Sequence, residues 1–102
     1  MQVKPIAFIY NNVVECHTEE EIRTICGAVD EIRINNGGDG SLTAHGLRHF
    51  VMDNNGIGVV CNDEDHISCR GSLSRIEYFR NNTEIYNIIS YEQATSNLIT
   101  KL

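Results

Sequence analysis

The sequence predicts an α+β fold, namely a mainly antiparallel sheet with an N-terminal hairpin, one helix after it and a C-terminal helix. Three observations lead to this class. Short segments rich in strand formers recur along the chain, a capped amphipathic segment follows the first of them, and clusters of Asn and Gly separate the others. The 102 residues, 41% of them hydrophobic and 22% charged, have the size and composition of a single domain, residues 1–102.

The N-terminal hairpin is predicted from residues 6–10 and 13–16, which are rich in strand-forming side chains. Asn11 and Asn12 separate these segments, and asparagine tolerates the positive φ angles of tight hairpin turns. Pro5 cannot donate to a neighbouring strand, so it marks either a strand start or a sheet edge. The two segments are therefore expected to pair as antiparallel strands.

The clearest helical segment opens at Thr18. Thr18 and Glu21 have the spacing of a capping box, and three consecutive glutamates favour the positive end of a helix dipole. Apolar residues follow at the helical spacing i, i+3, i+4 and i+7. They are Ile22, Ile25, Cys26 and Val29. Gly27 lowers the helix propensity by about 1 kcal/mol relative to alanine, which a packed helix tolerates.

The period of the apolar residues changes to two from Glu31 onward. Ile32 and Ile34 alternate with polar residues, which predicts a half-buried strand. Residues 35–40 are all Asn, Gly or Asp and therefore predict a loop.

The segment 42–53 fits two structures. Its apolar residues have helical spacing, and the Asn-Asn-Gly that follows could end a helix. Alternatively, residues 47–53 and Ile57–Cys61 are two strands joined by an Asn-Gly turn, which is a strong hairpin signal. We favour the hairpin, because Gly46 and two histidines disfavour a helix.

Three further strands are predicted at residues 67–69, 76–79 and 85–90, the last two joined by a turn. Ser90 is expected to cap a C-terminal helix, with Glu92 in its first turn. The apolar face of this helix would comprise Ala94, Leu98, Ile99 and Leu102.

The charge distribution restricts the class of partner. A net charge of −6 and a pI of about 5.0 argue against direct binding of a nucleic acid. Between Val13 and Asp65, eleven acids and three bases give a net charge of −8, which favours attraction to a basic partner, solubility being the alternative reason. No apolar run approaches the ~20 residues of a membrane span. The N-terminal residues lack the features of a secretory signal, so a cytoplasmic location is expected.

The four cysteines, Cys16, Cys26, Cys61 and Cys69, are expected to be reduced in a cytoplasm. The alternative function is a small metal-binding protein or enzyme that uses Cys61, His66 and Cys69, which lie within nine residues of one another. Their spacing departs from the paired ligands of structural zinc motifs. Buried thiols that pack as small hydrophobic groups are the commoner outcome, so no cofactor is expected.

Residues 45–49, His-Gly-Leu-Arg-His, resemble the His-x-Leu-Arg-His box of tyrosine recombinases, whose His and Arg hold the scissile phosphate. That family has a larger, basic domain and a nucleophilic tyrosine at a set distance, whereas this chain is acidic and Tyr78 and Tyr86 lack matching flanks. Neither a nucleophile elbow nor a P-loop is present either. The chain is therefore not expected to be an enzyme.

The order of elements resembles bacterial immunity proteins of contact-dependent growth inhibition and polymorphic toxin systems. The resemblance rests on Cys-His-Thr-Glu-Glu-Glu-Ile at residues 16–22, Glu-Ile-Arg-Ile-Asn at residues 31–35, and the segment 50–60 ahead of a C-terminal helix. Such proteins are small, usually acidic and cytoplasmic, and each neutralises one toxin, often a nuclease or deaminase. The resemblance implies a non-enzymatic inhibitor.

Acidic loops are the candidate contacts for such a toxin, because recognition residues are usually carried by loops on a rigid sheet. The proposed residues are Asp39, Asp53, Asp63, Glu64 and Asp65. They would pair with the Lys and Arg of a basic active site and so occlude it. Tyr78 and Tyr86 are candidate aromatic anchors, with packing in the core as the alternative.

Overall fold

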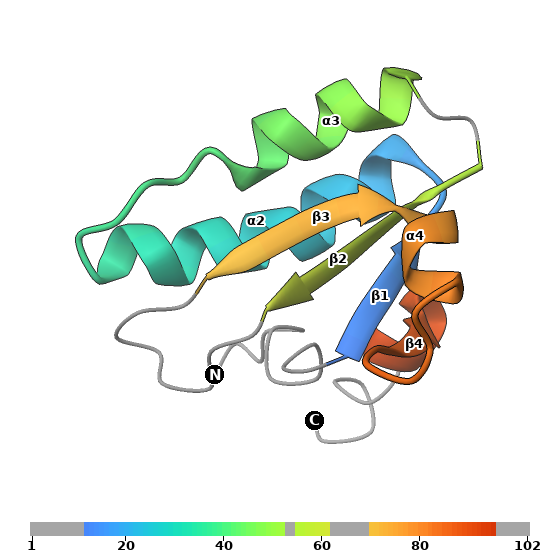
Figure 1. Cartoon of the computed structure of the whole chain (residues 1–102). Coiled ribbons are helices and arrows are strands. Elements are labelled where there is room, and N and C mark those ends of the chain that lie inside the picture. Colours follow the sequence, from blue (N-terminus) through green and yellow to red (C-terminus); the bar gives the residue numbers. More distant parts are fainter. Residues whose placement is uncertain (1–11, 53–54, 62–69, 96–102) are drawn as a thin grey trace.

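The computed structural model describes residues 12–52, 55–61 and 70–95. In chain order its elements are β1 (Asn12–Cys16), α2 (Glu19–Asn35), α3 (Leu42–Met52), β2 (Ile57–Cys61), β3 (Gly71–Arg75), α4 (Ile76–Arg80) and β4 (Asn87–Ser90), followed by helical residues 91–95. The strands form one sheet in the order β3-β2-β1-β4. The long helices α2 and α3 run side by side along the sheet, and the short α4 lies at one end of it (Figure 1).

The predicted α+β class is confirmed, but the sheet is mixed rather than mainly antiparallel. β1 pairs antiparallel with β2, and β2 pairs antiparallel with β3, whereas β1 and β4 are parallel. Residues 76–79, predicted as a strand, instead belong to α4. The chain between β3 and β4 is therefore a crossover that contains a helix, as parallel strands require, and not a hairpin turn.

The predicted N-terminal hairpin is not confirmed. Residues 13–16 form a strand as predicted, but both edges of β1 are paired, one with β2 and the other with β4. Residues 6–10 lie outside the described residues. The paired neighbours of β1 thus come from much later in the chain, where no local turn signal could identify them.

Helix α2 begins as predicted and continues further than predicted. Thr18 Oγ1 accepts a hydrogen bond from the Glu21 N–H (3.1 Å), and the Glu21 carboxylate accepts one from the His17 N–H (3.0 Å). The strand predicted from Glu31 onward is wrong, because Ile32 extends the buried helical stripe while Ile34 is 58% exposed. The predicted loop follows the helix.

The preferred hairpin over residues 47–53 is wrong, because α3 is a helix, although the Ile57–Cys61 strand is confirmed. The start of α3 is fixed by Asp30, a buried residue of α2. Asp30 Oδ1 accepts from the Leu42 N–H (2.9 Å), while Oδ2 accepts from the Thr43 N–H (2.9 Å) and hydroxyl (2.7 Å). These bonds satisfy backbone donors that a helix N-terminus leaves open.

Gly46, which disfavoured a helix in the sequence, lies where α3 packs against α2. A Cβ built on Gly46 would come within 2.9 Å of Ile22 Cγ2 and 3.1 Å of Cys26 Sγ. Close packing of the two helices therefore requires glycine at this position, at some cost in helix propensity.

The end of the described chain agrees in part with the prediction. The strand predicted at residues 85–90 is shorter, because β4 spans Asn87–Ser90. Ser90 caps the following helix: its Oγ accepts from the Gln93 N–H (3.0 Å), and the Gln93 side chain accepts from the Ser90 N–H (2.9 Å). Ala94 is buried as expected. Strand β3 was not predicted, and residues 67–69, 98 and 99 lie outside the described residues.

The core has two parts, one on each face of the sheet. The larger part lies between the sheet and the helices α2 and α3, and includes Val14, Ile25 and Val59. The smaller part lies on the opposite face, where Ile76 and Phe79 of α4 pack against Val13 and Val60, with Tyr86 and Ile88 beside them. No helix within the described ranges is long and apolar enough to span a membrane.

Candidate functional site

Of the five acidic residues predicted to contact a partner, the structure describes Asp39. Asp39 lies in the exposed loop between α2 and α3, where its carboxylate accepts a hydrogen bond from Ser41 Oγ (2.9 Å). Asp53, Asp63, Glu64 and Asp65 lie outside the described residues. The exposure of Asp39 agrees with a loop contact, while the joint site of all five stays a prediction.

The cysteines that the structure describes are buried in the larger core. The side chains of Cys16, Cys26 and Cys61 have no exposed surface. Burial raises the pKa of the Cys26 thiol to about 12, and Asp30 contributes to this rise. Protonated, buried thiols pack as small hydrophobic groups, and Cys26 does so in the larger core.

The metal site proposed as an alternative involves Cys61, His66 and Cys69, and the last two lie outside the described residues. Cys61 is buried at the end of β2. Elsewhere, within the parts of the chain that the structure describes, no three His, Cys, Asp or Glu side chains come together as metal ligands.

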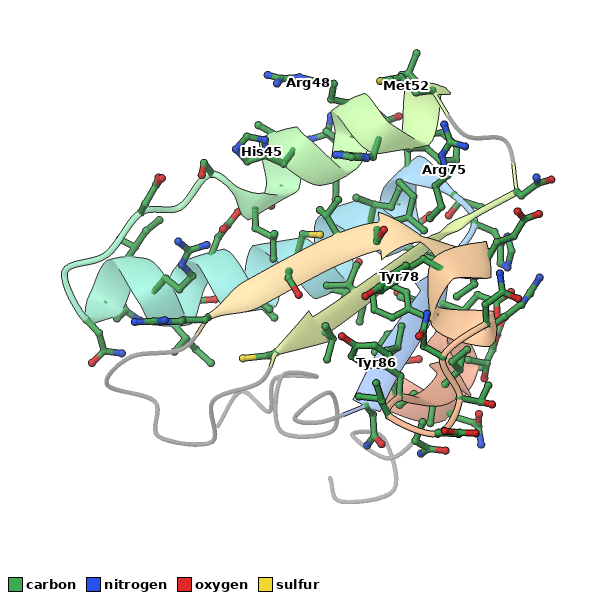
Figure 2. All side chains as sticks on the ribbon, viewed as in Figure 1. His45, Arg48, Met52, Arg75, Tyr78 and Tyr86 are labelled. Carbon is green, nitrogen blue, oxygen red and sulfur yellow. The ribbon has the colours of Figure 1, made fainter. Side chains whose placement is uncertain are left out.

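The His-Gly-Leu-Arg-His segment was expected on a strand. It lies instead on helix α3. His45, Arg48, His49 and Met52 follow one another at helical spacing, and all four side chains are exposed. Figure 2 shows Arg48 and Met52 projecting from the side of α3 that faces away from α2. The side of α3 toward the sheet buries Leu42 and Gly46. The outer stripe is thus presented to solvent.

A groove of about 380 Å³ lies between the end of α3 and the junction of β3 with α4. Its lining residues are His49, Met52, Ser74, Arg75, Glu77, Tyr78 and Asn81. Arg75 lies between Met52 and Tyr78 in the view of Figure 2. We call these seven residues the α3–α4 groove. It combines the apolar side chains of Met52 and Tyr78 with the polar side chains of His49, Arg75 and Glu77.

Exposed apolar side chains are concentrated at this groove. Met52 is 69% exposed and Tyr78 51% exposed, and Val51, next to Met52, is 79% exposed. The Tyr78 ring packs in a T-shaped contact against the Phe79 ring, with the two ring centroids 5.4 Å apart. Phe79 is 3% exposed. Tyr86 packs edge-on against Phe79 at 4.9 Å. Tyr78 is therefore a candidate anchor as predicted, whereas Tyr86 is part of the packed aromatic cluster.

A second cavity, of about 210 Å³, lies at the carboxyl ends of the parallel strands β1 and β4. Glu15 and His17 line it, and the Glu15 carboxylate accepts hydrogen bonds from the His17 Nε2 and from Arg80 (2.7 Å). Partial burial acts to raise the pKa of Glu15, but these hydrogen bonds and the nearby positive charges lower it below its usual value.

His17, which lines this second cavity, packs between Glu15 and Gly56. Its Nε2 is hydrogen-bonded to Glu15, and its Nδ1 faces Gly56, where a Cβ would come within 2.7 Å of that nitrogen. Gly56 has a φ of +108°, which favours glycine as well. Glu15 and His17 are thus engaged with each other, and the α3–α4 groove is the stronger candidate site.

The groove escaped prediction from the sequence because residues 47–53 were interpreted as a strand. The available signal was the helical spacing of His45, Arg48, His49 and Met52.

Comparisons with protein-family models, with curated proteins and with solved structures find no match for the chain.

Proposed function

We propose that this protein is a non-enzymatic protein-binding domain that neutralises a partner protein, in the manner of bacterial immunity proteins. The observation that supports binding is the exposure of Met52 and Tyr78 on either side of the α3–α4 groove, with Val51 beside them. Clustered large apolar side chains on a surface mark interaction sites more often than isolated ones do.

The composition of the groove fits a protein partner. Tyr, Met and Arg are enriched in protein interfaces, and binding energy is concentrated in a few such residues surrounded by a polar rim. Here Met52 and Tyr78 would form the apolar centre, while His49, Arg75 and Asn81 would form the rim. The Tyr78 ring also contacts the buried Phe79 ring, so part of this side chain is packed before a partner binds.

The test is a comparison of two double variants in affinity capture from the cells in which the protein occurs. Met52→Ala with Tyr78→Ala removes the apolar centre of the groove. Ile34→Ala with Ile85→Ala removes side chains of similar exposure, 58% and 73%, that do not line the groove. We expect the wild type and the control to retain a stoichiometric protein that the groove variant loses. Equal retention by both double variants would contradict the proposal.

A second candidate is the occlusion of a basic toxin domain, such as a nuclease, by the acidic surface. The net charge of −6 favours it, and so do the exposed carboxylates of Glu19, Glu20, Glu31 and Asp39 on and after α2. Desolvated charge pairs at an interface contribute several kcal/mol, whereas pairs at the rim contribute little.

The acidic loops are tested by neutralising Asp63→Asn, Glu64→Gln and Asp65→Asn together, and separately Asp39→Asn and Asp53→Asn. If these loops bind a basic partner, its retention will fall in each variant and will decrease with added salt. Unchanged retention in both variants would remove the five acids from the binding surface.

A further inference from the structure

We infer that Gly46 is a positioning residue that sets the width of the α3–α4 groove. Because Gly46 has no side chain, α3 lies close to α2 and β3, and this close approach fixes how far the Met52 wall of the groove stands from the Tyr78 wall. The inference rests on the protein-binding function proposed above and adds what determines the size of the partner side chain that the groove accepts.

Gly46 lies where three elements meet. A Cβ on Gly46 would lie 2.9 Å from Ile22 Cγ2 and 3.1 Å from Cys26 Sγ, both in α2, and 3.4 Å from Leu73 Cδ2 in β3. Ile22 and Cys26 have no exposed surface, and side chains in a close-packed core have little space to move aside. Helix α3 buries fewer of its residues than α2, so added bulk at Gly46 is expected to shift α3 outward.

The walls of the groove continue directly from this meeting point. Helix α3 and strand β3 lie side by side and run toward the same end of the sheet (Figure 1). In α3, His49 lies about one turn after Gly46 and Met52 about two turns after it. In β3, Ser74 follows Leu73 directly. His49, Met52 and Ser74 all line the groove, so the separation of α3 from β3 at Gly46 determines the separation of the walls.

The start of α3 is a fixed point about which the helix can tilt, because Asp30 accepts a hydrogen bond from the Leu42 N–H. With a rise of about 1.5 Å per residue, Gly46 lies about 6 Å and Met52 about 15 Å from Leu42 along the helix. Carbon atoms in optimal contact are about 3.5–4.0 Å apart, so a Cβ 2.9 Å from Ile22 Cγ2 requires a shift of roughly 1 Å. A tilt about Leu42 enlarges this shift to roughly 2–3 Å at Met52.

The experiment measures the separation of the walls in the wild type and in Gly46→Ala by electron paramagnetic resonance. Spin-labelled unnatural amino acids replace Val51 in α3 and Ile85 after α4, two exposed residues that do not line the groove. The Val51–Ile85 distance is expected to be longer by roughly 2 Å in the variant. The distance from Ile34 of α2 to Ile85 should stay the same. An unchanged Val51–Ile85 distance, or an equal change in both distances, would overturn the inference.

Retention of the partner in affinity capture separates this role from a loss of stability. Ile25→Val in α2 is the matched control, because trimming a buried isoleucine lowers stability without adding bulk between the helices. Gly46→Ala is expected to lower retention by roughly threefold or more, since the centre of an interface is packed as closely as a protein interior. The control should leave retention unchanged, and equal losses in both variants would contradict the role of groove width.

The two measurements together distinguish this inference from the proposed function. If Gly46→Ala lengthens the Val51–Ile85 distance and retention is still complete, the partner does not bind in the groove. That result would overturn the proposed function and leave the dependence of the groove on Gly46 intact.

Discussion

Helices α2 and α3 pack against each other on the same face of the sheet, yet they bury very different shares of their residues. Seven of the 17 residues of α2 are buried, against two of the 11 residues of α3. Helix α2 is capped at its start by its own Thr18, whereas α3 takes its cap from Asp30 of α2. Helix α3 thus depends on α2 for its position and exposes most of its surface.

This difference separates the helix that supports the fold from the helix that is available for binding. The buried stripe of α2, from Ile22 to Ile32, contributes to the core along the whole helix. Helix α3 buries Leu42 and Gly46 fully and Leu47 and Phe50 in part, and it presents Arg48 and Met52 outward (Figure 2). Changes in α2 should therefore affect stability, and changes on the outer stripe of α3 should affect binding.

The largest effect is expected for Asp30→Ala, which removes the cap that α2 provides for the start of α3. Two backbone N–H groups and the Thr43 hydroxyl lose their acceptor, and buried donors without a partner are costly. We expect the free energy of unfolding to fall by about 3 kcal/mol in urea titrations. Asp39→Ala, which removes an exposed carboxylate bonded to Ser41, is the control and should cost less than about 0.5 kcal/mol. Similar losses for both variants would contradict the capping role of Asp30.

Glycine-to-alanine changes in the two helices should have opposite signs. Gly27→Ala in α2 should raise the free energy of unfolding by about 0.5–1 kcal/mol, because a Cβ there meets no other atom within 4 Å. Gly46→Ala in α3 should lower it by about 1 kcal/mol, since overpacking against Ile22 outweighs the gain in helix propensity. The pair is measured by thermal and urea unfolding. Stabilisation by both substitutions would show that α2 and α3 are not closely packed at Gly46.

A smaller effect on stability, one that depends on pH, is expected from a change at Glu15. Because its pKa is lowered in the folded protein, the stabilisation is complete above the usual carboxyl value of 4.5 and is lost as the pH falls through the lowered value. Glu15→Gln should therefore reduce stability near neutral pH by about 1 kcal/mol or less, since Arg80 and His17 are about half exposed. The difference should disappear in acid. A loss of stability that stays the same in acid would contradict this role of the Glu15 carboxylate.

The smallest effect on stability is expected for Met52→Ala on the outer stripe of α3. Its side chain is 69% exposed, so the free energy of unfolding should change by less than about 0.5 kcal/mol. Urea titration measures this change, and retention of the partner is measured on the same sample. A loss of stability beyond about 1 kcal/mol would place Met52 in the fold and not in a binding surface.

The sequence predicted features that depend on nearby residues. The cap at Thr18, the stripe from Ile22 to Val29 and the cap at Ser90 each involve residues within a few positions of one another. Helix α3 was missed because its start depends on Asp30, 12 positions before Leu42. The strand predicted from Glu31 onward was wrong because Ile32 and Ile34 alternate with polar residues in sequence. In the structure both belong to α2, where Ile32 is buried and Ile34 is exposed.

The groove was beyond sequence reasoning for a related reason. Its walls come from the end of α3 and from the β3–α4 junction, which are brought together by the sheet. The sequence predicts a strand at residues 76–79, whereas these residues lie in α4 and Tyr78 lines the same groove as Met52. The negative net charge also favoured acidic loops as the binding surface, whereas α3 carries no Asp or Glu.

Site-specific photo-crosslinking tests the central claim, that α3 presents a binding surface while α2 supports the fold, most directly. A photoreactive amino acid is placed at Met52 in one sample and at Ile34 of α2 in another, two exposed positions on different helices. The account predicts one discrete protein adduct from position 52 and none from position 34. An adduct from position 34 with none from position 52 would contradict it.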